Sequence, residues 1–105
     1  MVKNVNVEQF DELLKNANKP VICDFYATWC GPCKMLAPVL EQLSEEYGEK
    51  AEFIKVDIDD NMELAARYGI MSIPLVAVFK DGEQVDKSLG FMPKSEAKQF
   101  IEKNL

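Results

Sequence analysis

The stretch VICDFYATWCGPCK, residues 21–34, decides the fold. Its first half is apolar or aromatic apart from Asp24, which is typical of a central strand covered on both faces. Apolar residues then recur at helical spacing from position 35 to position 43. The stretch therefore predicts a buried strand over residues 21–27 that leads into a helix beginning within residues 30–32.

The neighbouring segments predict how the first helices begin and end. Residues 2–5 are expected to form a short strand, and Asn6 with Gln9 three residues later has the spacing of a capping box. Pro38 lies inside the helix after the central strand and is expected to kink it, because proline removes one backbone hydrogen bond. Gly48 is expected to end that helix.

A third strand over residues 53–58 and a short helix come next in the chain. Asp59 or Asp60 stands where an N-cap side chain would accept backbone hydrogen bonds. Gly69 directly follows Tyr68, so the helix is expected to run to Tyr68 and to end at the glycine.

The last third of the chain predicts a hairpin and one more helix. Strands over residues 75–79 and 84–89 are joined by Asp81-Gly82, a dipeptide typical of tight hairpin turns. Pro93 then opens an amphipathic helix. The resulting order is βαβαβαββα, so we predict an α/β fold with a central mixed five-stranded sheet flanked by four helices.

Composition and charge argue against several classes of function. The chain has 105 residues, 48% of them apolar, which fits one domain over residues 1–105. Its net charge is −6 and it has no stripe of Lys and Arg, so nucleic acid and anionic membrane are poor partners. No apolar run is long enough to cross a bilayer, and residues 1–10 lack the layout of a signal peptide. We therefore expect a cytoplasmic monomer.

The chemistry of the chain is expected to lie in Cys30 and Cys33, at the predicted start of a helix. Free backbone N–H groups there stabilise negative charge, which favours the thiolate of Cys30, the attacking form of a cysteine. Cys33 follows about one helical turn later and can close a disulfide with it. Pro32 sets a helical backbone angle, and Gly31 lets a partner chain approach. We expect Cys30 to be the exposed attacker and Cys33 the sheltered resolving cysteine.

Three other interpretations of the pair are weaker. A structural zinc site needs four Cys or His ligands, and the chain has no His and only Cys23 in addition to the pair. An inert structural disulfide would gain little from so short a loop. Two chance cysteines are improbable because CxxC beside a βαβ pattern is itself a redox signal. Cys23 is interpreted as a small core residue that faces away from Asp24.

The segment from Asp24 to Lys34 resembles the active site of the thioredoxin family. The likeness extends to Pro38, to residues 55–57 and 69–74, and to Gly90, and the resemblance as a whole covers nearly all of the chain. The resemblance implies the thioredoxin fold. It also implies a protein dithiol–disulfide oxidoreductase, an enzyme and electron carrier that reduces partner proteins through its two cysteines.

The resemblance assigns roles to two charged residues near the pair. Burial should raise the pKa of Asp24, and the family places the matching carboxyl behind the cysteines as a proton acceptor for the second one. The alternatives are a carboxyl satisfied by backbone donors or exposed at the end of its strand. Lys55 resembles the lysine that tunes this acid, and the alternative is a lysine that only extends to solvent from an edge.

The family also implies a shallow apolar surface where partner segments dock. Trp29 could be a core residue, but its place directly before Cys30 favours this surface. The bond between Ile73 and Pro74 is trans by sequence statistics and cis by resemblance, and we expect cis. The expected docking residues are Trp29, Gly31, Pro32, Ile73, Pro74 and Gly90.

The resemblance also implies which proteins the chain acts with and that it needs no bound cofactor. No bound cofactor or metal is expected, and electrons would come from NADPH through a thioredoxin reductase and go to disulfide-containing client proteins. An oxidase or isomerase on the same fold, and a binding module without turnover, are the rival functions. Tyr26, Leu75 and Phe91 depart from the commonest family pattern, and the last two bear on the choice of client.

Overall fold

A computed structural model describes residues 1–105, and its elements follow one another in the predicted order. The sheet has five strands in the order β1-β3-β2-β4-β5. Neighbours β1, β3 and β2 run parallel, whereas β4 is antiparallel to β2 and β5 to β4. The predicted mixed sheet and four helices are therefore confirmed. The elements are β1 (Lys3–Asn4), α1 (Val7–Asn16), β2 (Val21–Tyr26), α2 (Gly31–Tyr47), β3 (Glu52–Asp57), α3 (Met62–Arg67), β4 (Leu75–Lys80), β5 (Glu83–Leu89) and α4 (Lys94–Glu102).

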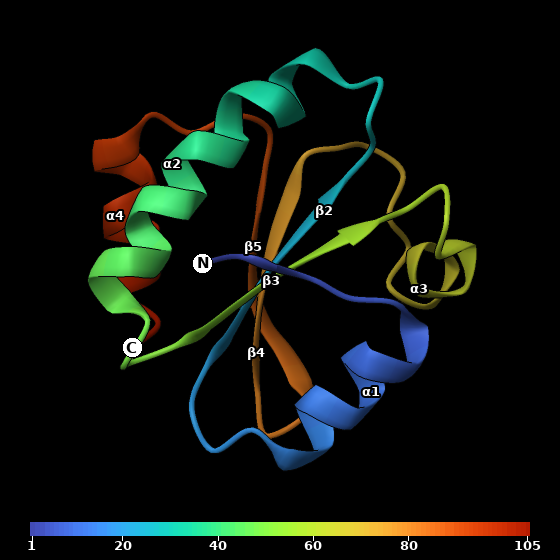
Figure 1. The fold of residues 1–105 in the computed structure, drawn as a ribbon, viewed down its shortest axis with the longest axis horizontal. Coiled ribbons are helices and arrows are strands. Elements are labelled where there is room, and N and C mark those ends of the chain that lie inside the picture. Colours follow the sequence, from blue (N-terminus) through green and yellow to red (C-terminus); the bar gives the residue numbers. More distant parts are fainter.

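The helices cover both faces of the sheet, with α2 and α4 on one side and α1 and α3 on the other (Figure 1). The strand β2 lies at the centre of the sheet, and its first five residues are buried. Successive side chains of a strand point to opposite faces, so β2 contributes to two separate cores. Ile22 packs in the core beneath α2 and α4, whereas Cys23 and Phe25 pack in the core beneath α1 and α3.

The ends of the first two helices follow local chemistry. The capping box at α1 is confirmed: the Gln9 N–H donates to Asn6 Oδ1 at 2.9 Å, and the Asn6 N–H donates to Gln9 Oε1 at 3.0 Å. Pro38 lies inside α2 as predicted. Gly48 follows the last residue of α2, but its φ of −60° is right-handed. Its lack of a side chain matters for space, because a Cβ there would lie 2.6 Å from the Ser44 carbonyl oxygen.

The start of α3 differs from the prediction. Its N-cap position is held by Asn61, and neither Asp59 nor Asp60 caps the helix. The Asn61 amide instead donates to the Asp57 carbonyl at 3.0 Å and accepts from the Val7 N–H at 3.2 Å, tying β3 to α1. The Asn61 side chain therefore makes contacts with other elements instead of capping α3.

The end of α3 and the hairpin follow the prediction. Gly69 has a φ of +62°, its N–H donates to Ala66, and the next N–H donates to Ala65, which is the Schellman pattern of a helix end. Asp81 and Gly82 form the β4–β5 turn with φ values of +53° and +81°. None of the four helices has the length and apolar character that a membrane span requires.

Candidate functional site

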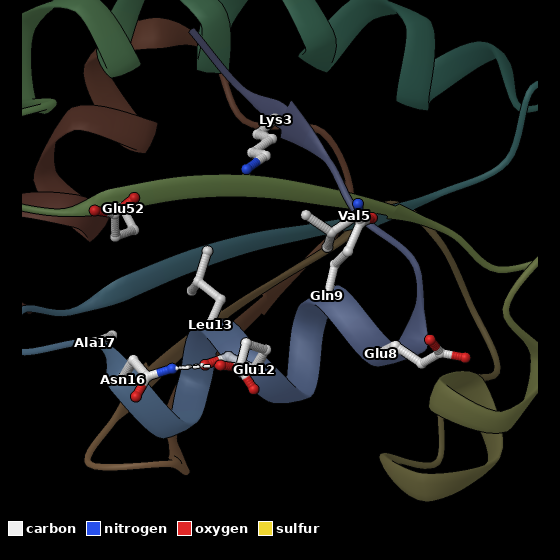
Figure 2. Close-up of a pocket in the computed structure, with 9 residues that line it drawn as sticks. All are labelled: Lys3, Val5, Glu8, Gln9, Glu12, Leu13, Asn16, Ala17 and Glu52. Atoms are coloured by element: carbon white, nitrogen blue, oxygen red, sulfur yellow. Dashed lines mark hydrogen bonds between the residues drawn. The ribbon is translucent and has the colours of Figure 1, made fainter.

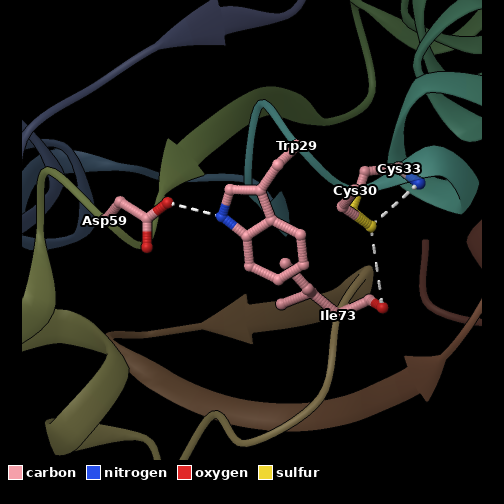
Figure 3. Close-up of a disulfide and its surroundings, with 5 residues drawn as sticks. All are labelled: Trp29, Cys30, Cys33, Asp59 and Ile73. Carbon is pink, nitrogen blue, oxygen red and sulfur yellow. Dashed lines mark hydrogen bonds between the residues drawn. A yellow bond between two sulfur atoms is a disulfide. The ribbon is translucent and has the colours of Figure 1, made fainter.

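The two cysteines lie at the junction of β2 and α2, at the carboxyl end of the central strand. Cys30 is the N-cap residue of α2, and its Sγ accepts a hydrogen bond from the Cys33 N–H at 3.2 Å (Figure 3). The structure holds Cys30 and Cys33 as a disulfide. The sulfur of Cys30 thus occupies the place where a helix N-terminus stabilises an anion, so reduction would leave a stabilised thiolate there.

Burial does not distinguish the two cysteines, contrary to the sequence-based expectation. Cys30 is 5% exposed and Cys33 is 3% exposed. Their surroundings differ instead. The Cys30 sulfur lies 3.9 Å from the carbonyl oxygen of Ile73, in the loop before β4, whereas Cys33 lines a pocket on the α2 side of the sheet. The expected exposed attacker is therefore a buried sulfur beside a surface loop, because the helix start and this loop close around it.

Asp24 lies behind the disulfide as a nearly isolated buried acid. Asp24 is 4% exposed, and its Oδ1 has no hydrogen-bond partner. Burial raises the pKa of Asp24 to about 7, and the charge of Lys55 opposes that rise. The unpartnered Oδ1 contradicts a carboxyl satisfied by backbone donors, and the burial of Asp24 contradicts a carboxyl exposed at a strand end.

Lys55 is the register partner of Asp24 on the neighbouring strand β3. It is half-buried, and its strand lies between β1 and β2 rather than at an edge of the sheet. A pocket of about 270 Å³ joins the two charged residues to Cys33. Its lining residues are Asp24, Tyr26, Ala27, Thr28, Cys33, Lys34, Ala37 and Lys55.

A larger hollow of about 640 Å³ lies elsewhere, between α1 and the β1 edge of the sheet (Figure 2). Its lining includes Glu8, Glu12 and Glu52 but no cysteine and no fully buried charged group. Lys3 reaches over it from β1. The larger hollow is thus separate from the pocket that contains Cys33.

The expected docking residues surround Cys30 with different degrees of exposure. Trp29 is 68% exposed, so the core interpretation of this tryptophan is wrong. The Ile73–Pro74 bond is cis, as expected, but Pro74 is buried rather than at the surface. The Gly90 N–H donates to the Pro74 carbonyl at 2.7 Å. Gly31 and Pro32 are exposed, and Ile73 and Gly90 are half-buried.

Sequence reasoning missed one partner of the site, Asp59. The Trp29 Nε1–H donates to Asp59 Oδ2 at 2.8 Å (Figure 3). Asp59 follows β3, and the carboxyl ends of parallel neighbours β2 and β3 meet at one edge of the sheet. That topology was the available signal, but the helix-cap interpretation of Asp59 concealed it.

The remaining cysteine is separate from the site. Cys23 is free and fully buried on the α1 and α3 side, and burial is the main cause that raises the pKa of its thiol. Its interpretation as a small core residue is confirmed. No three His, Cys, Asp or Glu side chains converge in a way that could hold a metal ion.

Comparisons with known proteins agree on one family. The sequence model of the family named Thioredoxin matches residues 1–103. The chain is 53% identical over 85 residues to a Bacillus subtilis thioredoxin, covering 81% of this chain and 82% of that one. It is 49% identical over 104 residues to a Staphylococcus haemolyticus thioredoxin, covering 99% and 98%. The solved structure of Plasmodium falciparum thioredoxin superposes with a TM-score of 0.91 at 44% identity, covering 99% of this chain and all of that one.

Proposed function

The chain belongs to the thioredoxin family of protein disulfide oxidoreductases, and on that premise we propose that it reduces disulfides in client proteins with electrons from a thioredoxin reductase. The observation that carries the proposal is the position of Cys30 Sγ, which accepts the Cys33 N–H at the start of α2. A sulfur held there is activated as a thiolate when the pair is reduced.

The proposed cycle is thiol–disulfide exchange. The Cys30 thiolate attacks one sulfur of a client disulfide, forming a mixed disulfide and releasing the client's other sulfur as a thiolate that takes up a proton. Cys33, once deprotonated, attacks the Cys30 sulfur and forms the intramolecular disulfide seen in the structure. The client leaves with both cysteines reduced, and the pair has lost two electrons.

Asp24 is the proposed proton acceptor for Cys33. Both residues line the same pocket, and no other carboxyl does so. A pKa of about 7 suits a group that must accept a proton near neutral pH and return it. Lys55 tunes this acid in the proposal, because its positive charge favours the ionised carboxylate.

The proposed docking surface is the exposed ring of residues around Cys30. Trp29, Gly31 and Pro32 offer apolar surface, and the backbone N–H of Ile73 has no partner within the chain. An extended client segment can pair with such a free backbone group while its disulfide reaches Cys30.

The proposed supply of electrons needs no group bound to this chain. Members of the family act without a bound cofactor, and we propose that NADPH delivers electrons through the reductase. A pair recharged in this way works in a reducing compartment, so the proposal places the protein in the cytoplasm as a monomer.

Reductase-coupled reduction of insulin tests the proposal. With NADPH and a bacterial thioredoxin reductase, the wild-type chain should turn over, and Cys30→Ser should lose at least about 1,000-fold in rate because no other thiol is activated. Cys23→Ala is the matched control and should keep the wild-type rate. Insulin reduction that survives in Cys30→Ser would refute the proposal, and equilibration with glutathione would reveal an oxidant.

A further inference from the structure

Tyr26 shares the pocket behind the disulfide with the proposed proton acceptor, although the mechanism above gives it no role. Asp24 and Tyr26 are two residues apart on β2, so their side chains point to the same face of the sheet. Both line the pocket that also contains Lys55 and Cys33. Tyr26 is half-buried, so its ring is part of the wall between that pocket and solvent.

The Lys55 ammonium lies against the ring of Tyr26. Its Nζ is 5.7 Å from the ring centroid, within the range of a cation–π contact. The same ammonium is farther than 4.0 Å from every carboxylate oxygen, including those of Asp24, its register partner. Lys55 therefore forms no salt bridge with Asp24, and its ammonium lies within cation–π range of the tyrosine ring.

The hydroxyl of Tyr26 lies near polar side chains of β1 and β3. Burial, first of all, and the nearby carboxylate of Asp57 raise the pKa of the phenol, whereas the nearby Asn4 side chain acts to lower it. Tyr26 therefore stays neutral at physiological pH, and its ring keeps the electron-rich face that attracts a cation. The ring of Tyr26 on β2 thus faces the lysine that β3 supplies.

We propose that Tyr26 is a positioning residue for the Asp24–Lys55 pair, whose ring holds the lysine ammonium away from the carboxyl. The inference rests on the proposed role of Asp24 as proton acceptor. Without the ring, the ammonium is free to move through the pocket toward Asp24, because no other group holds it. A closer positive charge would stabilise the carboxylate and weaken it as a base.

Few other groups compete for this effect. On α2, Cys33 does not titrate while it is in the disulfide, and Lys34 is exposed at the pocket mouth. From β4, Asp24 is faced by its register partner Val76, which is apolar. Asp57 and Asp60 act on the phenol of Tyr26. Lys55 is therefore the charged group through which a change at Tyr26 would reach Asp24.

The test is a double-mutant cycle read by carboxyl ¹³C NMR of Asp24 in the oxidised protein. Tyr26→Leu should lower the pKa of Asp24 from about 7 to about 6, because the ammonium can then approach the carboxylate and favour its charged form. Tyr26→Phe keeps the ring that holds the ammonium and should leave the pKa within about 0.3 of wild type. In the Lys55→Met background, Tyr26→Leu should shift the pKa less than half as far.

Each other outcome contradicts the proposal. An equal shift in both backgrounds would mean that Tyr26 only covers the pocket from water. A shift in Tyr26→Phe as large as that in Tyr26→Leu would assign the effect to the hydroxyl. The NMR measurement does not involve a client protein. A negative NMR result would therefore refute the role of Tyr26 without refuting disulfide reduction, and a negative insulin assay would refute disulfide reduction without refuting the effect of Tyr26 on Asp24 and Lys55. Far-UV circular dichroism of each variant confirms that it is folded.

Discussion

The central strand β2 faces aromatic side chains on one side of the sheet and charged side chains on the other. On the α1 and α3 side, four rings pack together with centroid separations of 5.2–6.5 Å, and we call them the aromatic cluster. On the α2 and α4 side, near the cysteines, β2 presents Asp24 to a pocket that contains Lys55. The aromatic cluster consists of Phe10, Phe25, Tyr68 and Phe79.

The difference shows how one strand supplies both stability and reactivity. Close-packed rings stabilise the fold, and the only polar group among these four is the hydroxyl of Tyr68. A buried carboxyl with an unpartnered oxygen destabilises the fold, because burial penalises its charged form. The aromatic cluster offsets that cost from the opposite face. Changes on the two faces should therefore have separable effects on stability and on chemistry.

The largest expected effect is on the aromatic face. Phe10 is fully buried and packs against all three other rings, so Phe10→Ala should lower the free energy of unfolding by about 3–5 kcal/mol. Urea denaturation followed by circular dichroism measures it. The pKa of Asp24 and the rate of insulin reduction per folded molecule should not change, and a change in either would contradict the separation of the two faces.

The next largest effect has the opposite sign and lies on the polar face. Below pH 3.8 Asp24 is protonated in both states, so it makes no difference to stability. Between pH 3.8 and about 7 the unfolded chain loses the proton and the folded chain keeps it, so stability falls as the pH rises. The cost is complete above pH 7, at up to about 4 kcal/mol. Asp24→Asn should therefore stabilise the oxidised protein at pH 8 by about 2–4 kcal/mol.

Urea denaturation at a series of pH values checks this prediction. Wild type should lose stability between about pH 4 and about pH 8, and Asp24→Asn should lose most of that dependence. Asp11→Asn, at a carboxyl on the other face that is exposed beside Arg67, is the matched control and should retain the fall. A wild-type pH dependence that persists in Asp24→Asn would mean that another group is responsible.

The smallest expected effect concerns the N-cap of α1, the helix that carries Phe10 of the aromatic cluster. Asn6→Ala removes the side-chain oxygen that accepts the Gln9 N–H at the start of α1, and it should cost about 1 kcal/mol. Asn6→Ser keeps an N-cap acceptor and should recover most of that loss in the same urea experiment. Insulin reduction should be unaffected by both changes. An activity loss in Asn6→Ala alone would show that α1 communicates with the cysteines.

Local patterns predicted most of the elements because their determinants are short-range. The capping box at Asn6, the turn at Asp81-Gly82 and the end of α3 at Gly69 each depend on a few neighbouring residues. The predicted start of α3 was wrong for the opposite reason. Asp59 has the chemistry of a helix cap, but its oxygen bonds to Trp29, thirty positions earlier in the chain.

The exposure of the cysteines was also beyond local reasoning. The pattern indicates that Cys30 begins a helix, but the Ile73 loop that closes over its sulfur comes from another part of the chain. The cis bond before Pro74 came from the resemblance to the family, because sequence statistics alone favour trans. Burial depends on what packs against a residue, and that is a property of the whole fold.

The sequence by itself determined the strand-to-helix junction that holds Cys30 and Cys33, because the start of a helix depends on the few residues at that start. It also determined that an acid lies in the central strand. Only the tertiary structure decided that Asp24 keeps an unpartnered oxygen and that the Lys55 ammonium rests on Tyr26. Lys55 on β3 is about thirty residues from Asp24 and Tyr26 on β2, so these surroundings exist only after the sheet has assembled.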